Sequence, residues 1–291
     1  MKKKILITGA SSFLGEGLAE TLKNKFDIIL LEHKKPIKSK TETTIIRGNV
    51  ENTSGWENKL TQVEIIIHLA SISHAKYLKR FEEINTQGTI NLVNLGLKKG
   101  AHQFIYISTR TIGKNCGAYG ESKEIAEDYI KNSSINYTII RPGEAYDENF
   151  TRSEGLGTIS RLVENNIFIP YIVDKNTSYS PIHIKDVQDG ILATVDNPVT
   201  YGKTYNLSGP ENLSLKQVIK RIYLLKKTHP TLVPIHRIFI QIVFSLIKMV
   251  NKNAVLDQLE RLLWIRTEKL SKNVESDLKI KPRYFLKDSL N

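Results

Sequence analysis

Residues 5–15 read ILITGASSFLG, a short apolar strand followed at once by a turn with glycine at positions 9 and 15. Gly9 permits a tight turn from strand to helix, and Gly15 permits close packing of that helix on a sheet. The free N–H groups at the start of such a helix attract an anionic group. The stretch therefore predicts a site for the pyrophosphate of a dinucleotide, with contacts from Gly9, Ser11, Ser12, Phe13 and Leu14.

The middle glycine of such a loop is replaced by Ser12, which places a Cβ where the backbone approaches the phosphate. We therefore expect an altered approach of the pyrophosphate. For this stretch alone, a plain strand, turn and helix with small residues is the alternative interpretation.

An acidic residue about 20 positions after the glycine turn binds the ribose hydroxyls in dinucleotide sites. Glu32, at the end of the apolar run 28–31, fits this role. Its carboxylate repels a 2′-phosphate and thereby favours NAD. The next residues, His33, Lys34 and Lys35, offer cations to such a phosphate, so NADP is the alternative cofactor.

The composition is that of a globular protein. The chain has 291 residues, of which 40% are hydrophobic and 25% charged, enough for one large or two modest domains. The net charge of +12 suits an anionic small molecule. The lysines are scattered and not interleaved with aromatic residues, so we expect no nucleic-acid partner.

Cysteine and apolar patterning bear on the compartment. Cys116 is the single cysteine, which excludes an internal disulfide and indicates a reducing compartment. The apolar stretch behind the first lysines is too short for a signal peptide, and no run of about 18 apolar residues predicts a membrane span. We therefore expect a cytoplasmic protein. The histidines show no metal-ligand spacing, so no metal is predicted.

Strands and helices alternate through the first half of the chain. This alternation predicts an α/β fold with a Rossmann-like, doubly wound parallel sheet and ligand sites at the carboxyl ends of the strands. We assign residues 1–150 mainly to this dinucleotide-binding domain. The expected strands are 5–7, 26–31, 43–47, 64–68, 103–108 and 137–141, and the expected helices are 14–25, 79–99 and 119–131.

Beyond residue 143 the alternation ends. Helices are expected near 153–165, from about 185, and over 213–227, with a strand over 203–207. We assign 151–291 mainly to a smaller, substrate-capping α/β lobe, with elements near 180–210 returning to the first domain.

Residues 238–250 are almost wholly apolar. Because the apolar positions surround the predicted helix, burial in the C-terminal lobe or a homodimer contact is the simpler interpretation. A helix that lies on a membrane surface is the alternative.

Three residues form a candidate catalytic group. Ser108 ends a predicted strand, and the helix that follows carries Tyr119 and Lys123 one turn apart on one face. An adjacent ammonium lowers the pKa of a tyrosine from its usual value near 10, which suits the phenol to acid–base work. The same Tyr-x-x-x-Lys spacing recurs at Tyr171 and Tyr223, but neither follows a strand that ends in serine.

The ordered set of motifs resembles the extended short-chain dehydrogenases/reductases, the NAD-dependent epimerase/dehydratase family. The resemblance covers roughly residues 1–225. It implies catalytic roles for Ser108, Tyr119 and Lys123, with Asn85 supporting the lysine through water. The matching stretches are 8–15, 68–70, 85–92, 108, 119–123, 141–143, 183–187 and 205–209. Expected cofactor contacts in or next to them are Leu69, Ala70, Ser71, Pro142 and Gly143. Asn49 and Val50 are expected contacts for a different reason, since they follow the expected strand 43–47, where an adenine ring could lie.

Many members of that family act on nucleotide-linked sugars, and we expect a substrate of this kind. Two departures bear on it: Ser108 and Tyr119 are only 11 positions apart, and the usual arginine is missing from 176–182. A smaller ketone or aldehyde, or a non-catalytic dinucleotide-binding role, is the alternative. Expected substrate contacts are Ser73, Thr109, Arg110 and Glu144.

The residues after Ser108 also rank the reactions. Dehydratases of the family carry an acidic residue there, whereas this chain has Thr109 and Arg110, so dehydration ranks below epimerisation and reduction. For His183 and Asp186, a polar pair that satisfies backbone groups at a helix start is the favoured interpretation.

Overall fold

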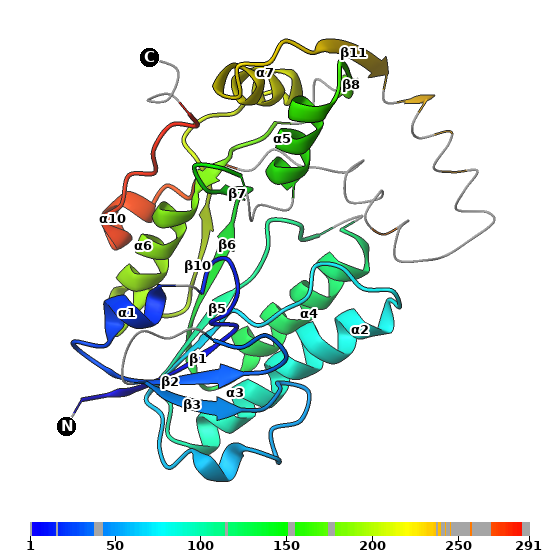
Figure 1. Ribbon diagram of the computed structural model, residues 1–291. Helices are drawn as coiled ribbons and strands as arrows, with labels where there is room; N and C mark the ends of the chain where they lie inside the picture. Colours follow the sequence, from blue (N-terminus) through cyan, green and yellow to red (C-terminus); the bar gives the residue numbers. More distant parts are fainter. Residues whose placement is uncertain are drawn as a thin grey trace.

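Seven parallel strands form one central sheet in the order β10-β6-β5-β4-β1-β2-β3. In this computed structural model the described residues are 2–15, 17–37, 43–113, 116–150, 155–173, 178–236, 238, 239, 242, 245, 257 and 269–286. The expected Rossmann-like doubly wound sheet is confirmed (Figure 1). Its strands are β1 Lys4–Thr8, β2 Asp27–Glu32, β3 Thr44–Arg47, β4 Ile65–His68, β5 Gln103–Ile107, β6 Asn136–Pro142 and β10 Lys203–Leu207.

The central strands are buried on both faces. Ile5 and Ile7 of β1 face one hydrophobic core cluster and Leu6 faces the other, and all three side chains are fully buried. Continuous apolar runs of this kind are typical of parallel strands that are covered by helices on both sides.

Helices cover both faces of the sheet (Figure 1). One face packs against α1 Leu18–Leu22, α6 Ile184–Thr194 and α10 Val274–Leu278. The other packs against α3 Gly88–Lys98 and α4 Gly117–Asn132. The chain reaches α3 through α2 Lys79–Phe81 and the π-helical turn η2 Glu82–Gln87, and the short η1 Glu57–Lys59 precedes β4.

A smaller lobe lies beyond the carboxyl ends of the strands (Figure 1). Its core contains Leu156, Val163, Ile169, Val218 and Ile222. The lobe consists of β7 Ala145–Tyr146, α5 Gly155–Asn165, β8 Phe168–Val173, β9 Ile182–His183, α7 Leu215–Leu225 and β11 Thr231–His236, while η3 Pro198–Thr200 leads into β10. Two parallel pairs, β7 with β9 and β8 with β11, were not expected from the sequence.

The first helix is shorter than predicted. The pattern indicates residues 14–25, but α1 begins at Leu18. Gly17 precedes it with a φ of +87°, which is a left-handed conformation. Gly15 leaves no room for a side chain, because a Cβ there would lie 2.5 Å from the Gly9 carbonyl oxygen. Residues 10–15 therefore form a compact turn ahead of the helix.

The C-terminal segment 269–286 connects the sheet and the lobe. Val274 and Leu278 of α10 belong to the core of the sheet, and Phe285 belongs to the core of the lobe. Arg283 binds Asp186 of α6 through its backbone N–H and its guanidinium, at 2.9 Å each. Residues 151–291 thus contribute to both parts of the molecule.

Of the apolar stretch 238–250, the structure describes four residues. Ile238, Phe239 and Ile242 are 54%, 64% and 54% exposed. The other residues lie outside the described part, apart from Ser245, so the choice between burial in the C-terminal lobe, a homodimer contact and a membrane-surface contact stays a prediction. In the described part of the chain, no helix is long and apolar enough to cross a membrane.

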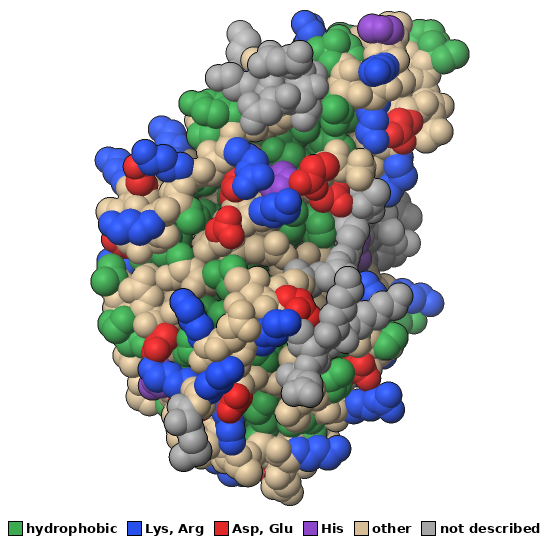
Figure 2. Space-filling model, turned by 60° about the vertical axis from the view of Figure 1, so that its left-hand side comes forward, with side chains coloured by type: hydrophobic (Ala, Val, Ile, Leu, Met, Phe, Trp, Pro, Cys, Tyr) green, Lys and Arg blue, Asp and Glu red, His purple; other side chains and the backbone are tan. Residues whose placement is uncertain are grey.

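Charged side chains of both signs lie on one face of the molecule. Figure 2 shows Lys and Arg side chains interspersed with Asp and Glu on the face that it presents. Within the described residues, no group of three or more His, Cys, Asp and Glu side chains is placed to hold a metal ion.

Candidate active site

The glycine turn lies against the end of β4. Gly9 has a φ of +71°, and a Cβ there would lie 2.6 Å from the Ala70 backbone N and 2.7 Å from the Leu69 carbonyl carbon. Only glycine fits this close approach. The structure thereby brings three expected cofactor contacts, Gly9, Leu69 and Ala70, to one place, and Ser71 follows as an exposed residue.

Ser12 takes part in the turn itself. Its N–H donates to the Gly9 carbonyl at 2.9 Å, and its hydroxyl accepts from the Gly15 N–H at 3.1 Å. Residues 11–14, which the sequence predicts to contact a pyrophosphate, therefore lie in this turn and not in a helix, because α1 begins only at Leu18.

Neighbouring contacts fix the rest of the turn. The Ser11 carbonyl accepts from Lys35 Nζ at 3.2 Å, and the Leu14 carbonyl accepts from Gln188 of α6 at 3.2 Å. Phe13 and Leu14 are half-buried.

Glu32 ends β2 with both carboxylate oxygens in use. One oxygen accepts from the Ile37 N–H at 2.8 Å and the other from Arg47 Nε at 3.0 Å. These two bonds, the amide first, lower the pKa of Glu32. A carboxylate has about four acceptor positions, so each oxygen keeps one for a ribose hydroxyl. His33 follows as an exposed residue.

Asn49 and Val50 follow β3. The Asn49 carbonyl accepts from the Trp56 indole N–H at 2.8 Å. Val50 is buried against Gly88, where a Cβ would lie 2.6 Å from Val50 Cγ2.

A chain of hydrogen bonds leads from β1 to Asn85. Thr89 donates to the Asn85 carbonyl at 2.6 Å, so its oxygen accepts from His68 Nε2 at 3.0 Å. His68 Nδ1 then accepts from the Thr8 hydroxyl at 2.7 Å. Burial, followed by the nearby Lys123 charge, lowers the pKa of His68 well below its usual value and keeps the ring neutral. This chain was not foreseen from the sequence.

Asn85 sits in the π-helical turn η2, a distortion that is frequent at functional sites. Its side chain accepts from the Ile72 N–H at 2.9 Å and donates to the Ile72 carbonyl at 3.0 Å and to Ser122 Oγ at 3.1 Å. Ser122 in turn donates to the Tyr119 carbonyl at 2.7 Å. Asn85 therefore joins the loop after β4 to the helix that carries Tyr119 and Lys123.

The side chain of Lys123 is almost completely buried. Its Nζ donates to the Ile107 carbonyl at the end of β5, at 2.8 Å, and lies 4.2 Å from the centre of the Tyr106 ring. Burial lowers the pKa of Lys123 to about 7, and the charge of Glu127 opposes this shift.

Glu127 was not predicted as a site residue from the sequence, although it lies on the same helical face, four residues after Lys123. It is fully buried and accepts from Arg141 Nε at 2.8 Å and from Lys131 Nζ at 3.1 Å. Burial alone would raise its pKa, but the hydrogen bonds and positive charge of Arg141 outweigh burial and lower it. The ion pair of Glu127 with Arg141 joins α4 to β6.

Ser108 and Tyr119 complete the expected catalytic group. Ser108 is buried after β5, and its N–H donates to the Ile140 carbonyl at 2.8 Å. Tyr119 is half-buried in the first turn of α4, with its ring edge-to-face against Phe81 at 5.9 Å. The preceding Ala118 N–H donates to Asp257, a contact from the C-terminal third that the sequence did not predict.

The expected substrate contacts follow β4, β5 and β6. Arg110 and Glu144 form an ion pair of 2.9 Å, although they lie 34 positions apart in the sequence. Thr109 is buried and accepts from the Thr111 N–H at 3.1 Å. Ser73 lies after β4, with its hydroxyl 3.0 Å from His74 Nδ1.

Gly143, after Pro142, is held at the junction with the lobe. Its N–H donates to the Leu207 carbonyl at 2.8 Å, and a Cβ there would lie 2.9 Å from the Ser180 carbonyl oxygen. The backbone after β6 is therefore fixed where the resemblance expects the nicotinamide.

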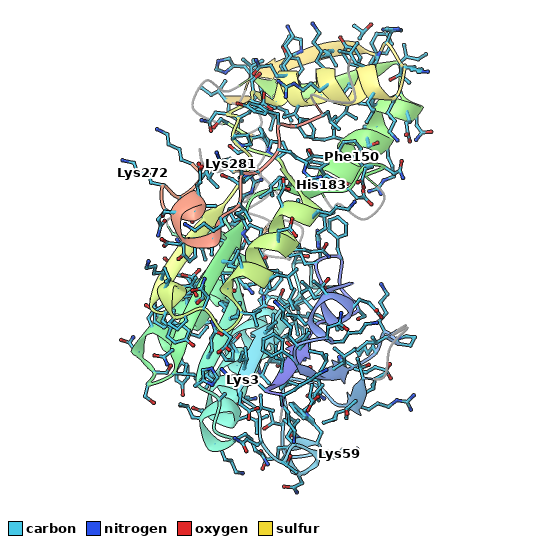
Figure 3. The ribbon with its side chains drawn as sticks, turned by 90° about the vertical axis from the view of Figure 1, so that its left-hand side faces the viewer. Lys3, Lys59, Phe150, His183, Lys272 and Lys281 are labelled. Atoms are coloured by element: carbon cyan, nitrogen blue, oxygen red, sulfur yellow. The ribbon has the colours of Figure 1, made fainter. Side chains whose placement is uncertain are left out.

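His183 and Asp186 are structural. His183 Nδ1 accepts from the Lys185 N–H at 3.3 Å as the cap of α6, and Asp186 binds Arg283. Figure 3 labels His183 and Phe150, and both rings pack on Tyr146 at 5.3 and 5.7 Å where the lobe meets the sheet.

A family model described as the NAD dependent epimerase/dehydratase family matches residues 5–208, more than half of the chain. The chain belongs to this epimerase/dehydratase family. UDP-glucose 4-epimerase of Vibrio cholerae is 26% identical over 249 residues, which cover 76% of this chain and 75% of that enzyme. Ceramide reductase of Caulobacter vibrioides is 23% identical over 199 residues, or 67% of this chain and 62% of that protein.

Solved structures agree with the family fold. UDP-glucose 4-epimerase of Thermotoga maritima with UDP-glucose matches with a TM-score of 0.71 at 16% identity, over 99% of this chain and 96% of that chain. The dTDP-glucose 4,6-dehydratase of Bacillus anthracis in complex with NAD matches with a TM-score of 0.73 at 16% identity, over 99% and 94%.

The epimerase/dehydratase family is NAD-dependent, and the residues present fit that cofactor. Gly9 allows the turn after β1 to pack directly against the backbone after β4, and Glu32 places a carboxylate at the end of β2. Both features are what a dinucleotide requires of its pyrophosphate and ribose sites.

Proposed function

We propose that this chain is an NAD-dependent epimerase or oxidoreductase that acts on a hydroxyl or keto group of a nucleotide-linked sugar. The observation that carries the proposal is the placement of Lys123, buried below the end of β5 and one helical turn from Tyr119. Burial of an ammonium group lowers the free energy of unfolding. Buried ionisable groups of this kind are frequent at functional sites, where their chemistry is needed.

Tyr119 would exchange the proton of the substrate hydroxyl. The Lys123 ammonium favours the phenolate form of Tyr119 by its positive charge, so that the phenolate can take the proton. Ser108 would donate a hydrogen bond to the same substrate oxygen and hold it in place. When bound, NAD supplies the chemistry of hydride acceptance and return.

Glu127 and Asn85 would position this group. The negative charge of Glu127 stabilises the charged form of Lys123. Glu127 also connects α4 to β6 through its ion pair with Arg141. Asn85 ties the same helix to the loop after β4 through Ser122 and Ile72. Together they set the distance between the proton-transfer group and the cofactor side of the site.

Support for the substrate class comes from the relatives. The Vibrio cholerae relative is a UDP-glucose 4-epimerase that aligns with three quarters of the chain. The similarity to a ceramide reductase supports the second candidate, a reductase of a smaller or non-nucleotide ketone. Thr109 and Arg110 after Ser108 leave dehydration as the least favoured reaction.

We also propose that the enzyme is cytoplasmic, because Cys116 is the single cysteine. The net charge of +12 favours an anionic small molecule as its substrate. The exposed Ile238, Phe239 and Ile242 support a homodimer contact. Light scattering on the purified chain tests the dimer.

The test of the proposed function is to supply the purified protein and its cofactor with UDP-linked sugars and with simple ketones and aldehydes. Epimer formation is followed by NMR and NADH by its absorbance. Turnover of a nucleotide-linked sugar is the expected result, and turnover of simple ketones alone would select the second candidate. Mass spectrometry of the released cofactor distinguishes an epimerase, which retains NAD, from a reductase.

A further inference from the structure

Arg110 and Glu144 form a partly buried ion pair beside the proposed reacting group. Arg110 Nη2 donates to Glu144 Oε2 at 2.9 Å, and the two side chains are 16% and 22% exposed. Arg110 follows Ser108 by two positions, and Glu144 directly follows Gly143. Because β5 and β6 are neighbours in the sheet, the pair lies where two adjacent strands end.

The guanidinium of Arg110 packs on the aromatic ring of Tyr179. It lies 5.9 Å from the centre of the Tyr179 ring, a cation–π distance. Tyr179 is itself held by two backbone hydrogen bonds to Leu213, each 2.8 Å long. The sequence lacks the expected arginine in 176–182, and Arg110, from a different part of the chain, lies over Tyr179 within that segment.

Glu144 is held in place through both its backbone and its side chain. Its backbone carbonyl accepts from the Ile182 N–H at 3.0 Å. Its Oε1 lies 2.2 Å from where a Cβ of Gly155 would be, so it rests against the first residue of α5. The N-terminal end of a helix is a favourable place for a carboxylate.

Such a pair has no net charge but keeps hydrogen-bonding capacity. Arg110 has five N–H donors, of which the ion pair uses one among the described residues, and Glu144 Oε1 is an acceptor. Sugar hydroxyls both donate and accept, so they can use both halves of the pair. A carboxylate on the ring would meet the charge of Glu144 and compete with it for Arg110.

We propose that Glu144 is a built-in counter-ion for Arg110, and that the pair selects an uncharged, hydroxylated sugar ring against a ring that carries a carboxylate. This inference rests on the proposed function, since it concerns the sugar part of a nucleotide-linked substrate. It assigns the two residues to specificity and not to the proton transfer itself.

The test compares the binding of UDP-glucose and UDP-glucuronate to the NAD-loaded Tyr119→Phe protein, in which the ligands are not turned over. Isothermal titration calorimetry gives the two Kd values. We expect UDP-glucose to bind at least about tenfold more tightly, a ratio that corresponds to about 1.4 kcal/mol. Glu144→Gln, added to this background, leaves Arg110 without its counter-ion and is expected to reduce the ratio about tenfold or to invert it.

Two further variants control for indirect effects. Arg110→Met together with Glu144→Gln removes the guanidinium and is expected to abolish the gain in UDP-glucuronate binding. Glu148→Gln removes an exposed carboxylate that pairs with His183, and should leave the ratio unchanged. NADH binding by fluorescence shows that each variant is folded; if Glu144→Gln does not fold, Arg110→Met alone is expected to weaken UDP-glucuronate further.

The binding results distinguish a failure of the counter-ion inference from a failure of the proposed function. Equal binding of both sugars by the Tyr119→Phe protein, or a ratio that Glu144→Gln leaves unchanged, overturns the counter-ion inference while the proposed function stands. If NAD binds but neither UDP-sugar does, the proposed function and the inference both fail.

Discussion

The hydroxyl of Ser12 accepts the Gly15 N–H at 3.1 Å, so the turn satisfies one of its own amides. Ser12→Gly would release that amide and remove the Cβ that we expect to lie where the pyrophosphate approaches. We expect tighter binding of NADH, because one added amide bond contributes about 1 kcal/mol, or about fivefold in Kd. Fluorescence titration with NADH measures the change.

Ser12→Ala is the matched control for this turn, because it releases the Gly15 amide but keeps the Cβ. We expect an intermediate Kd. Weaker binding by both variants would show that the Ser12 hydroxyl is itself a phosphate ligand.

The pair of Glu32 and Arg47 leads to a prediction on cofactor choice. Wild-type protein should bind NADH at least about tenfold more tightly than NADPH, since the carboxylate repels a 2′-phosphate. Glu32→Gln should narrow this ratio, because Arg47, whose side chain is 86% exposed, would lose its charged partner and face the phosphate.

Glu57→Gln removes another paired carboxylate, bound to Lys98 at 2.8 Å, and serves as the control. It should leave the NADH to NADPH ratio unchanged. Tighter binding of NADPH than of NADH by the wild-type protein would contradict the assignment of Glu32.

Lys123→Met should abolish turnover and yet stabilise the fold. With a folded pKa of about 7 and an ordinary value of 10.5, Lys123 bears its full burial cost below pH 7. From pH 7 to about 10.5 the unfolded chain keeps a proton that the folded chain has lost, so wild-type stability rises.

The gain in the free energy of unfolding should therefore be largest at pH 6, up to about 5 kcal/mol, and smaller at pH 9. Urea unfolding at both pH values measures it. A variant that is less stable than the wild type at pH 6 would show that the lysine stabilises the fold.

Glu127→Gln should destabilise the protein, because it leaves Arg141 without its buried partner. The expected loss is about 3 kcal/mol in urea unfolding at pH 7. Glu127 has a lowered pKa, so its contribution is present above the ordinary value of 4.5 and is lost as the pH falls through the folded value. The difference from wild type should shrink in acid.

Lys131→Gln is the comparison for this pair, because its ammonium bonds the same carboxylate but is 34% exposed. A loss below about 1 kcal/mol is expected for it. If the two variants are equally stable, the bond between Glu127 and Arg141 does not hold α4 to β6.

The strands of the large sheet were predictable because burial on both faces makes them short apolar runs. β10 has the expected bounds 203–207, and β5 differs by one residue. β8 and β11 were not predictable in the same way, since each contains a proline, Pro170 and Pro234, and proline argues against a central strand. A ribbon of two edge strands accepts both.

The three residues that we propose as catalytic could be predicted from their spacing, but the residues that hold them in place could not. Tyr119 and Lys123 share a local helical face, which the sequence displays directly. The π turn around Asn85 and the contacts of His68 with Thr8 and Thr89 depend on packing between distant segments. The pairing of Arg110 with Glu144 likewise follows from strand order.

We propose that Tyr119 performs the proton transfer of an NAD-dependent reaction on a nucleotide-linked sugar. The most direct measurement is turnover of UDP-linked sugars by wild-type and Tyr119→Phe proteins that bind NAD with equal Kd. We expect Tyr119→Phe to lose at least about 100-fold in kcat, the usual contribution of a positioned acid or base. Unchanged turnover by Tyr119→Phe, with NAD binding intact, would contradict it.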